Sequence, residues 1–180
     1  LYEYSGGTSK TIGDAGGNVR SIAEDFTSGE CVLYFTTENG VFSLAPDGVD
    51  GVKSVFRIDP ENKTEDLGNF IDPCGVCMKD GKLWVADSTI DAVQEIDLSD
   101  NGFTKFAITT NSNAVNRLSE KAKDVAIDRN TVYALDGNRI VRIENIRESV
   151  NTYHRISLGD RVFPVTFSAG NGYVCYATDH

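Results

Sequence analysis

Histidine is scarce in this sequence, which limits the catalytic chemistry that the chain can carry. Only two histidines occur among 180 residues. His154 lies in an alternating polar stretch beside Arg155, typical of a solvent-facing strand, and His180 is the last residue of the sequence. A hydrolytic triad needs a base that is held toward a nucleophile, and neither histidine is expected to serve as one. The sequence therefore predicts no catalytic residue.

Long apolar runs and an excess of basic residues are also missing. No apolar stretch approaches the roughly 18–20 residues that cross a bilayer, so no membrane insertion is expected. The 17 basic residues are outnumbered by 27 acidic ones, which gives a net charge of −10. Such a charge repels phosphate backbones and excludes nucleic acid as a partner. The remaining partner classes are a protein, a glycan or further copies of the chain.

No linker or low-complexity tract divides the chain. With 40% hydrophobic residues, a chain of this length can bury a core of its own. We therefore predict one domain over residues 1–180.

A short apolar window recurs four times with an aromatic residue at its second position. The windows are residues 33–37, 83–87, 132–136 and 175–179, and the aromatic residues are Tyr34, Trp84, Tyr133 and Tyr176. Their intervals of 50, 49 and 43 residues are those of a structural repeat. We expect these aromatic side chains to pack between repeats.

Each window is flanked by further strand-like segments, which gives four strands per repeat. In the last repeat the sequence around 163–180 supplies the first two strands, and residues 1–13 supply the last two. Repetition of a four-stranded unit favours an all-β propeller over a sandwich or barrel. We predict four blades of four antiparallel strands, with one blade shared between the termini: about 18–66, 72–109, 121–160, and 163–180 plus 1–13. The alternative is an arc of a larger propeller.

The segment from Pro73 to Asp97, PCGVCMKDGKLWVADSTIDAVQEID, resembles the repeat of the NHL, SMP-30 lactonase-like and strictosidine-synthase-like β-propellers. Those families usually have six blades and about twice this length, so four blades would be a departure. A lactonase-like chain would hold a divalent cation through oxygen ligands from different blades. The acidic and amide residues near first strands are Asn18, Glu24, Asp25 and Asp128.

We expect the second strand of every repeat, including the fourth, to end at an equivalent position. Asp87, Asp136 and Asp179, with Thr37 in the first repeat, share one position. Together they could face a cation or a cationic ligand across one side of the ring. Alternatively, each carboxylate accepts hydrogen bonds from turn amides and closes its strand. No bound metal or cofactor is predicted.

Four cysteines leave one disulfide to consider. Cys31 and Cys175 lie on equivalent strands of the first and last repeats, which a closed ring would make neighbours, and a bridge needs Cα atoms within roughly 7 Å. Cys74 and Cys77 form a Cys-x-x-Cys pattern without the helix or second ligand pair that redox or zinc chemistry uses. We interpret those two as buried, inert thiols.

The sequence thus favours a non-catalytic binding or assembly module that presents propeller loops or edge strands to a protein, a glycan or itself. The alternative is a metal-dependent propeller hydrolase of the lactonase-like kind. The missing initiator Met, the even number of cysteines and the Asn62-Lys63-Thr64 sequon favour an extracellular or cell-surface location.

Overall fold

The computed structural model describes residues 1–11, 13–26, 29–45, 51–57, 70–89, 92–98, 102–108, 122–144, 152–158 and 164–178. These residues contain sixteen β-strands, β1 to β16. No helix among them is long and apolar enough to cross a membrane.

Twelve of the strands form three antiparallel sheets of four, which we call blades A, B and C. Blade A consists of β3 Ser21–Asp25, β4 Val32–Thr37, β5 Gly40–Leu44 and β6 Val52–Arg57. Blade B consists of β7 Pro73–Lys79, β8 Lys82–Asp87, β9 Ala92–Asp97 and β10 Gly102–Ile108. Blade C consists of β11 Ala122–Asp128, β12 Thr131–Asp136, β13 Arg139–Glu144 and β14 Thr152–Ser157. Within each blade, neighbouring strands follow one another in the sequence. The predicted β-propeller of four-stranded antiparallel blades is confirmed.

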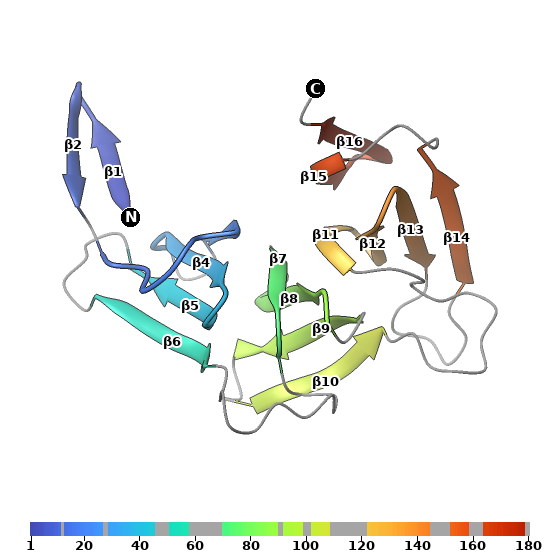
Figure 1. Ribbon diagram of the computed structural model, residues 1–180, viewed down its shortest axis with the longest axis horizontal. Coiled ribbons are helices and arrows are strands. Elements are labelled where there is room, and N and C mark those ends of the chain that lie inside the picture. The colour runs from blue at the N-terminus through green and yellow to red at the C-terminus, as the bar shows by residue number, and fades with distance from the viewer. Residues whose placement is uncertain are drawn as a thin grey trace.

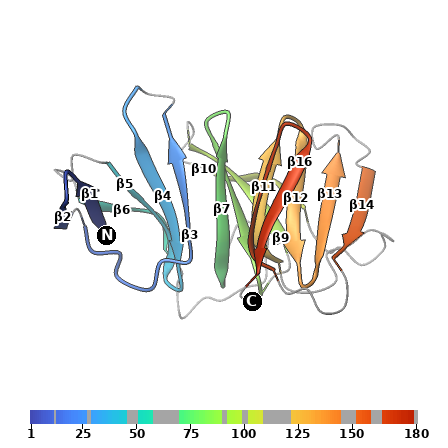
Figure 2. The same ribbon diagram turned by 90° about the horizontal axis from the view of Figure 1, so that it is seen from above.

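The four remaining strands form two hairpins at the ends of the row of blades. The N-terminal hairpin pairs β1 Tyr2–Ser5 with β2 Thr8–Thr11, and the C-terminal hairpin pairs β15 Pro164–Gly170 with β16 Tyr173–Thr178. The first strands β3, β7, β11 and β15 contact one another in order, and the sheets follow an open arc (Figure 1). Figure 2 shows β3, β7 and β11 side by side.

In the predicted fourth blade, the two hairpins were expected to join into one sheet. They form separate two-stranded sheets instead, and they lie at opposite ends of the arc (Figure 1). The angle between neighbouring sheets depends on the side chains that fill the space between them, and the sheets form an arc in which the two hairpins do not meet (Figure 1).

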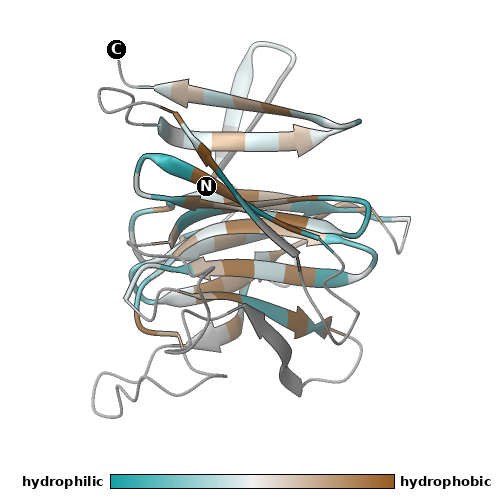
Figure 3. Cartoon of the chain, turned by 90° about the vertical axis from the view of Figure 1, so that its right-hand side faces the viewer, coloured by the Kyte–Doolittle hydropathy of each residue, from teal (hydrophilic) through white to brown (hydrophobic). Residues whose placement is uncertain are grey.

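Three hydrophobic layers lie between successive sheets, because each central strand has two buried faces, and a fourth cluster covers the N-terminal side of blade A with Ala15 and Leu1. On β8, Leu83 and Val85 pack against blade A, whereas Trp84 and Ala86 pack against blade C. Figure 3 shows hydrophobic segments on the stacked strands. Complete burial of a large apolar side chain stabilises a fold by about 1.5–3 kcal/mol, so these layers supply most of the stability.

Three of the four aromatic residues predicted to pack between repeats do so. Trp84 packs between blades B and C, and Tyr133 packs between blade C and the C-terminal hairpin. Tyr34 lies against the layer between blades A and B. At the N-terminal side of blade A, Phe35 and Phe42 stack with ring centroids 5.7 Å apart.

The alignment of the fourth repeat was wrong by one residue. Thr178 pairs with Pro164 just as Asp87 pairs with Pro73, so Thr178 occupies the position that the sequence assigned to Asp179. Cys175, not Tyr176, consequently corresponds to Trp84. The two-residue turn Asn171–Gly172 sets this register, since both residues have positive φ values of 52° and 81°, which Asn and Gly tolerate.

Close backbone approaches supplement the apolar layers. The hydroxyl of Ser21 accepts a hydrogen bond from the backbone N–H of Val76 across blades A and B (3.1 Å). Between blades B and C, Gly75 lies so close to Asp124 that an added Cβ would be 2.4 Å from the Asp124 Cα. Only a residue without a side chain fits there.

We predict that Gly75→Ala lowers the free energy of unfolding by about 3 kcal/mol, because the added methyl group must displace backbone atoms of blade C. Urea denaturation measures this. Gly170→Ala is the matched control, since its Cβ would meet nothing within 4 Å, and it should change stability by less than about 0.5 kcal/mol. Equal stability of the two variants would contradict the packing described here.

Candidate binding surfaces

Asp87, one of the four residues predicted to bind a ligand or close a turn, is engaged with backbone amides. Its Oδ2 accepts hydrogen bonds from the N–H groups of Ile71 (2.7 Å) and Asp72 (3.0 Å). Its Oδ1 accepts one from Thr89 (2.9 Å), and the residue is fully buried. These contacts fasten the segment that enters blade B to the turn after β8, as expected of a turn-closing residue.

Two of the other predicted positions, Asp136 and Thr37, lie on separate blades. Asp136 is fully buried at the end of β12. Thr37, at the end of β4, is also buried, and its hydroxyl accepts a hydrogen bond from the Asn39 N–H (3.0 Å). Asp179 lies outside the described residues. Ligand binding at these four positions stays a prediction, and the contacts of Asp87 and Thr37 are those of turns.

A polar cluster links blades A and B beside Asp87. The Arg20 guanidinium pairs with the Asp72 carboxylate, which also accepts a hydrogen bond from the Ser88 hydroxyl. This pairing raises the pKa of Arg20. The Thr36 hydroxyl donates to the Cys74 carbonyl (2.5 Å). Because Arg20 and Asp72 are each about one-third exposed, solvent screens their attraction and the pair contributes little stability.

The oxygen ligands considered for a lactonase-like metal site are not gathered in one place. Glu24 and Asp25 end β3, whereas Asp128 ends β11 on another blade. The Asp128 carboxylate accepts a hydrogen bond from the Gly172 N–H (2.9 Å). Among the described ranges, no three acidic, histidine or cysteine residues lie close enough together to hold a metal ion.

The disulfide considered between Cys31 and Cys175 is not formed, and all four thiols are free. The open arc explains this. Cys31 directly precedes β4 near one end of the arc, whereas Cys175 lies on β16 at the other end (Figure 1). Burial raises the pKa of the Cys77 thiol, and the nearby Asp124 carboxylate adds to the effect. Burial also raises the pKa of Cys74. Thiols that hold their protons are poor nucleophiles.

Asp124 is a buried carboxylate that was not among the site residues predicted from the sequence. Its Oδ2 accepts hydrogen bonds from the Thr166 hydroxyl (2.8 Å) and the Phe167 N–H (3.2 Å), both on β15. Burial raises its pKa, although these hydrogen bonds oppose the shift. An acidic residue directly before the apolar run Val125–Ile127 of β11 was the available signal. Asp124 fastens the C-terminal hairpin to blade C.

The outward face of the C-terminal hairpin is open. Ser168 and Cys175 pair across β15 and β16 on this face, and both are exposed. Tyr173, beside them, is 75% exposed. The equivalent face of blades A, B and C carries Tyr34, Trp84 and Tyr133 and packs against the next sheet. The C-terminal hairpin therefore presents an interface without a partner among the described residues.

At the opposite end of the arc, one face of blade A is partly uncovered near β3. Ala15 and Leu1 help to cover Phe35 and its neighbours on blade A. Ile22 pairs with Phe35 on the same face but is 52% exposed. Ala15 and Leu1 lie outside the two strands of the N-terminal hairpin, and the part of this face around Ile22 remains accessible.

We predict that Asp87→Ala lowers the free energy of unfolding by about 3 kcal/mol, because three backbone N–H groups lose their acceptor. Thermal or urea denaturation measures the change. Asp14→Ala is the control, because Asp14 is exposed and accepts a hydrogen bond from the Gly16 N–H, and its loss should cost less than about 1 kcal/mol. A neutral Asp87→Ala would contradict the turn-closing role.

We predict that the stability of the fold depends on pH through the buried Asp124 carboxyl group. Its raised pKa means that the folded chain holds this proton to a higher pH than the unfolded chain. The resulting stabilisation is complete below the unfolded pKa, about 3.9, and is lost as pH rises through the folded value. Compared with Asp124→Asn in urea denaturation, the wild type should therefore lose relative stability as pH rises from about 4. A relative gain over that range would contradict the assignment.

No protein family and no curated protein sequence matches the chain. Solved structures do match it. The crystal structure of a nidogen/laminin complex aligns with 96% of this chain and 60% of that chain, at a TM-score of 0.67 and 13% identity. The extracellular domain of a one-component system from B. thetaiotaomicron aligns with 92% of this chain and 21% of its own, at a TM-score of 0.56 and 16% identity.

Hsv2 from Kluyveromyces marxianus aligns with 91% of this chain and 43% of its own, at a TM-score of 0.53 and 12% identity. The chain thus spans 60% or less of the length of these three structures. At such low identity the likeness shows the fold alone, and the fold is a β-propeller.

Proposed function

We propose that this chain is a binding and assembly module whose open sheets receive strands from another copy of the same chain. The observation that carries the proposal is the pair of two-stranded hairpins at the two ends of the arc. Neither an enzyme activity nor a cofactor is part of it.

The hairpins supply complementary halves of a blade. In blades A, B and C the second strand pairs antiparallel with the third, as β8 does with β9. β15 and β16 correspond to the first two strands of a blade, and β1 and β2 correspond to the last two. Pairing β16 of one copy with β1 of the next would therefore complete a four-stranded sheet through backbone hydrogen bonds, as in strand-addition complexes.

The side-chain faces support the same arrangement. In the completed blade, the face with Tyr173 and Cys175 would cover the inner face of blade A of the next copy, where Ile22 is exposed. Association would bury this apolar surface, which is the usual driving force for protein contacts. The contact is head-to-tail, so it extends into longer assemblies unless it closes into a ring.

The comparisons support a binding role at the level of the fold. One matched structure is a nidogen/laminin complex, and another is an extracellular domain. The likeness to an extracellular domain and the sequon at Asn62 support an extracellular or cell-surface location as part of this proposal.

We predict concentration-dependent assembly of the wild-type chain in sedimentation velocity. Ile22→Lys and Cys175→Glu should each weaken association about tenfold or more, because each places an unpaired charge in the contact. Both side chains are solvent-accessible in the single copy, so the variants should fold. Asn130→Glu, at an exposed turn position between β11 and β12 in the middle of the arc, is the control and should assemble like the wild type.

Mixing the two variants tests the head-to-tail geometry. Each variant keeps one unaltered end, so a mixture of Ile22→Lys and Cys175→Glu chains should form dimers at concentrations where neither variant assembles alone. A wild type that stays monomeric at all concentrations would refute the proposal, as would variants that assemble like the Asn130→Glu control.

A further inference from the structure

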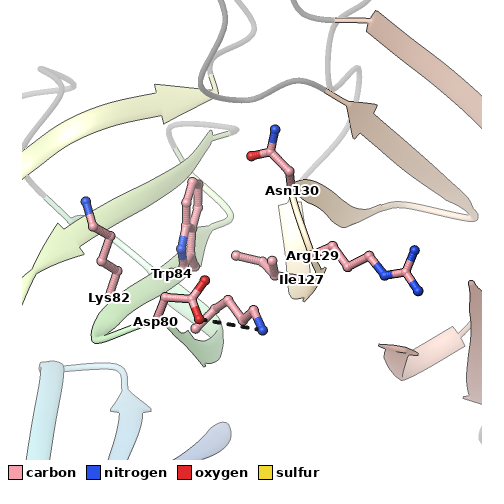
Figure 4. Close-up of a pocket in the computed structure, with 7 residues that line it drawn as sticks. Asp80, Lys82, Trp84, Ile127, Arg129 and Asn130 are labelled. Carbon is pink, nitrogen blue, oxygen red and sulfur yellow. Dashed lines mark ion pairs between the residues drawn. The ribbon is translucent and has the colours of Figure 1, made fainter. Parts of the chain in front are cut away.

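A small pocket lies between blades B and C, at the ends of the strands opposite to Asp87. The turn that joins β7 to β8 and the turn that joins β11 to β12 form its two sides (Figure 4). Its volume is about 90 Å³, well below the roughly 300–1,000 Å³ of sites that enclose a whole small molecule. The pocket therefore has room for one side-chain head group of a larger ligand.

The pocket combines an apolar floor with a polar rim. Trp84, which is only 1% exposed, and Ile127 line it from blades B and C. The rim carries Lys79, Asp80, Lys82, Arg129 and Asn130. Figure 4 shows the Arg129 side chain extending from its turn away from Trp84, at the outer side of the pocket.

The positively charged side chains of this rim differ in whether a carboxylate of the protein already pairs with them. The Lys82 ammonium pairs with the buried Glu95 carboxylate (3.1 Å) and with Asp97 (3.6 Å). Lys79 lies 3.7 Å from the Asp80 carboxylate. Arg129 is exposed and makes no ion pair with any residue that the structure describes. It is therefore the rim cation that can pair with a ligand.

The backbone of Arg129 gives a second, independent observation. The equivalent two-residue turns place positive φ values at Asp80 (52°), Arg129 (55°) and Asn171 (52°). Asp and Asn adopt this left-handed conformation readily, whereas a longer side chain does so at a conformational cost. The chain thus carries an arginine at a position where the other two turns have a residue better suited to the backbone.

We propose that the outer side of this pocket binds a carboxylate side chain of an acidic peptide segment, with Arg129 as the pairing cation. The planar guanidinium matches a carboxylate in a bidentate hydrogen-bonded pair. Trp84 and Ile127 contact the aliphatic stem of the bound residue, and the Asn130 amide can donate a further hydrogen bond. The site is distinct from the open sheets of the assembly proposal and does not depend on it.

The net negative charge of the protein favours an acidic peptide over a polyphosphate as the ligand. With a net charge of −10, the protein repels dense arrays of negative charge. A single carboxylate at a locally unpaired cation meets much less repulsion, because charges beyond about 10 Å are largely screened at ordinary ionic strength.

Trp84 makes the test site-specific, because it is the only tryptophan of the chain. Titration with a glutamate-rich peptide should change its fluorescence in a saturable way, and a lysine-rich peptide of equal length should not. Arg129→Asn should weaken the peptide's affinity about tenfold, the scale of a lost charged hydrogen bond. The same substitution should raise Tm by about 2–4 °C, because Asn suits the left-handed turn.

Lys123→Asn is the matched control, because it removes an exposed cation from the other end of β11 and should leave the affinity unchanged. An unaltered affinity in Arg129→Asn would overturn the proposal. So would an absence of any fluorescence change in the wild type, or an equal response to the lysine-rich peptide. A stronger response to inorganic phosphate than to the glutamate-rich peptide would refute the carboxylate class of ligand.

Discussion

The burial of both faces of each central strand between neighbouring sheets is the constraint on which the rest of the structure depends. β8 shows it most clearly, since Leu83 and Val85 contact one neighbour and Trp84 and Ala86 the other. No sheet of this kind can bury both faces by itself, so its stability depends on the sheets beside it. The open faces at the two ends of the arc follow directly from this dependence.

Polar contacts then fix how the sheets sit against one another. Gly75 lets blade B approach the backbone of Asp124, and the carboxylate of that residue holds β15 in turn. Asp87 fastens the segment that enters blade B. These buried groups have little freedom to serve a ligand, because their acceptor atoms are already used within the fold. Exposed side chains on the turns, such as that of Arg129, do not hold the sheets together in this way.

The repeated pattern allowed the blade architecture to be predicted from the sequence, because the spacing of Tyr34, Trp84 and Tyr133 reflects the same buried position in three blades. The prediction failed by one residue in the fourth repeat. There Tyr176 stands next to Cys175, and the aromatic residue was taken as the equivalent one. The turn at Asn171–Gly172 was the better guide to register.

Closure of the ring could not be predicted in the same way. The angle between sheets depends on how side chains from distant segments fill each layer, and sequence spacing does not contain it. The pocket was missed for a related reason, since Lys79 and Arg129 lie far apart in the chain and meet only when blades B and C pack. An arginine in a turn equivalent to Asp80–Gly81 was the one available signal.

The inter-sheet layers are tested most directly by native-state hydrogen exchange of the wild-type chain. We expect the slowest backbone exchange in β8 and β12, since both faces of each strand are covered, and faster exchange in the N-terminal hairpin. β1 and β2 exchanging as slowly as β8 at low protein concentration would contradict it, because packing between sheets could then not be the main source of stability.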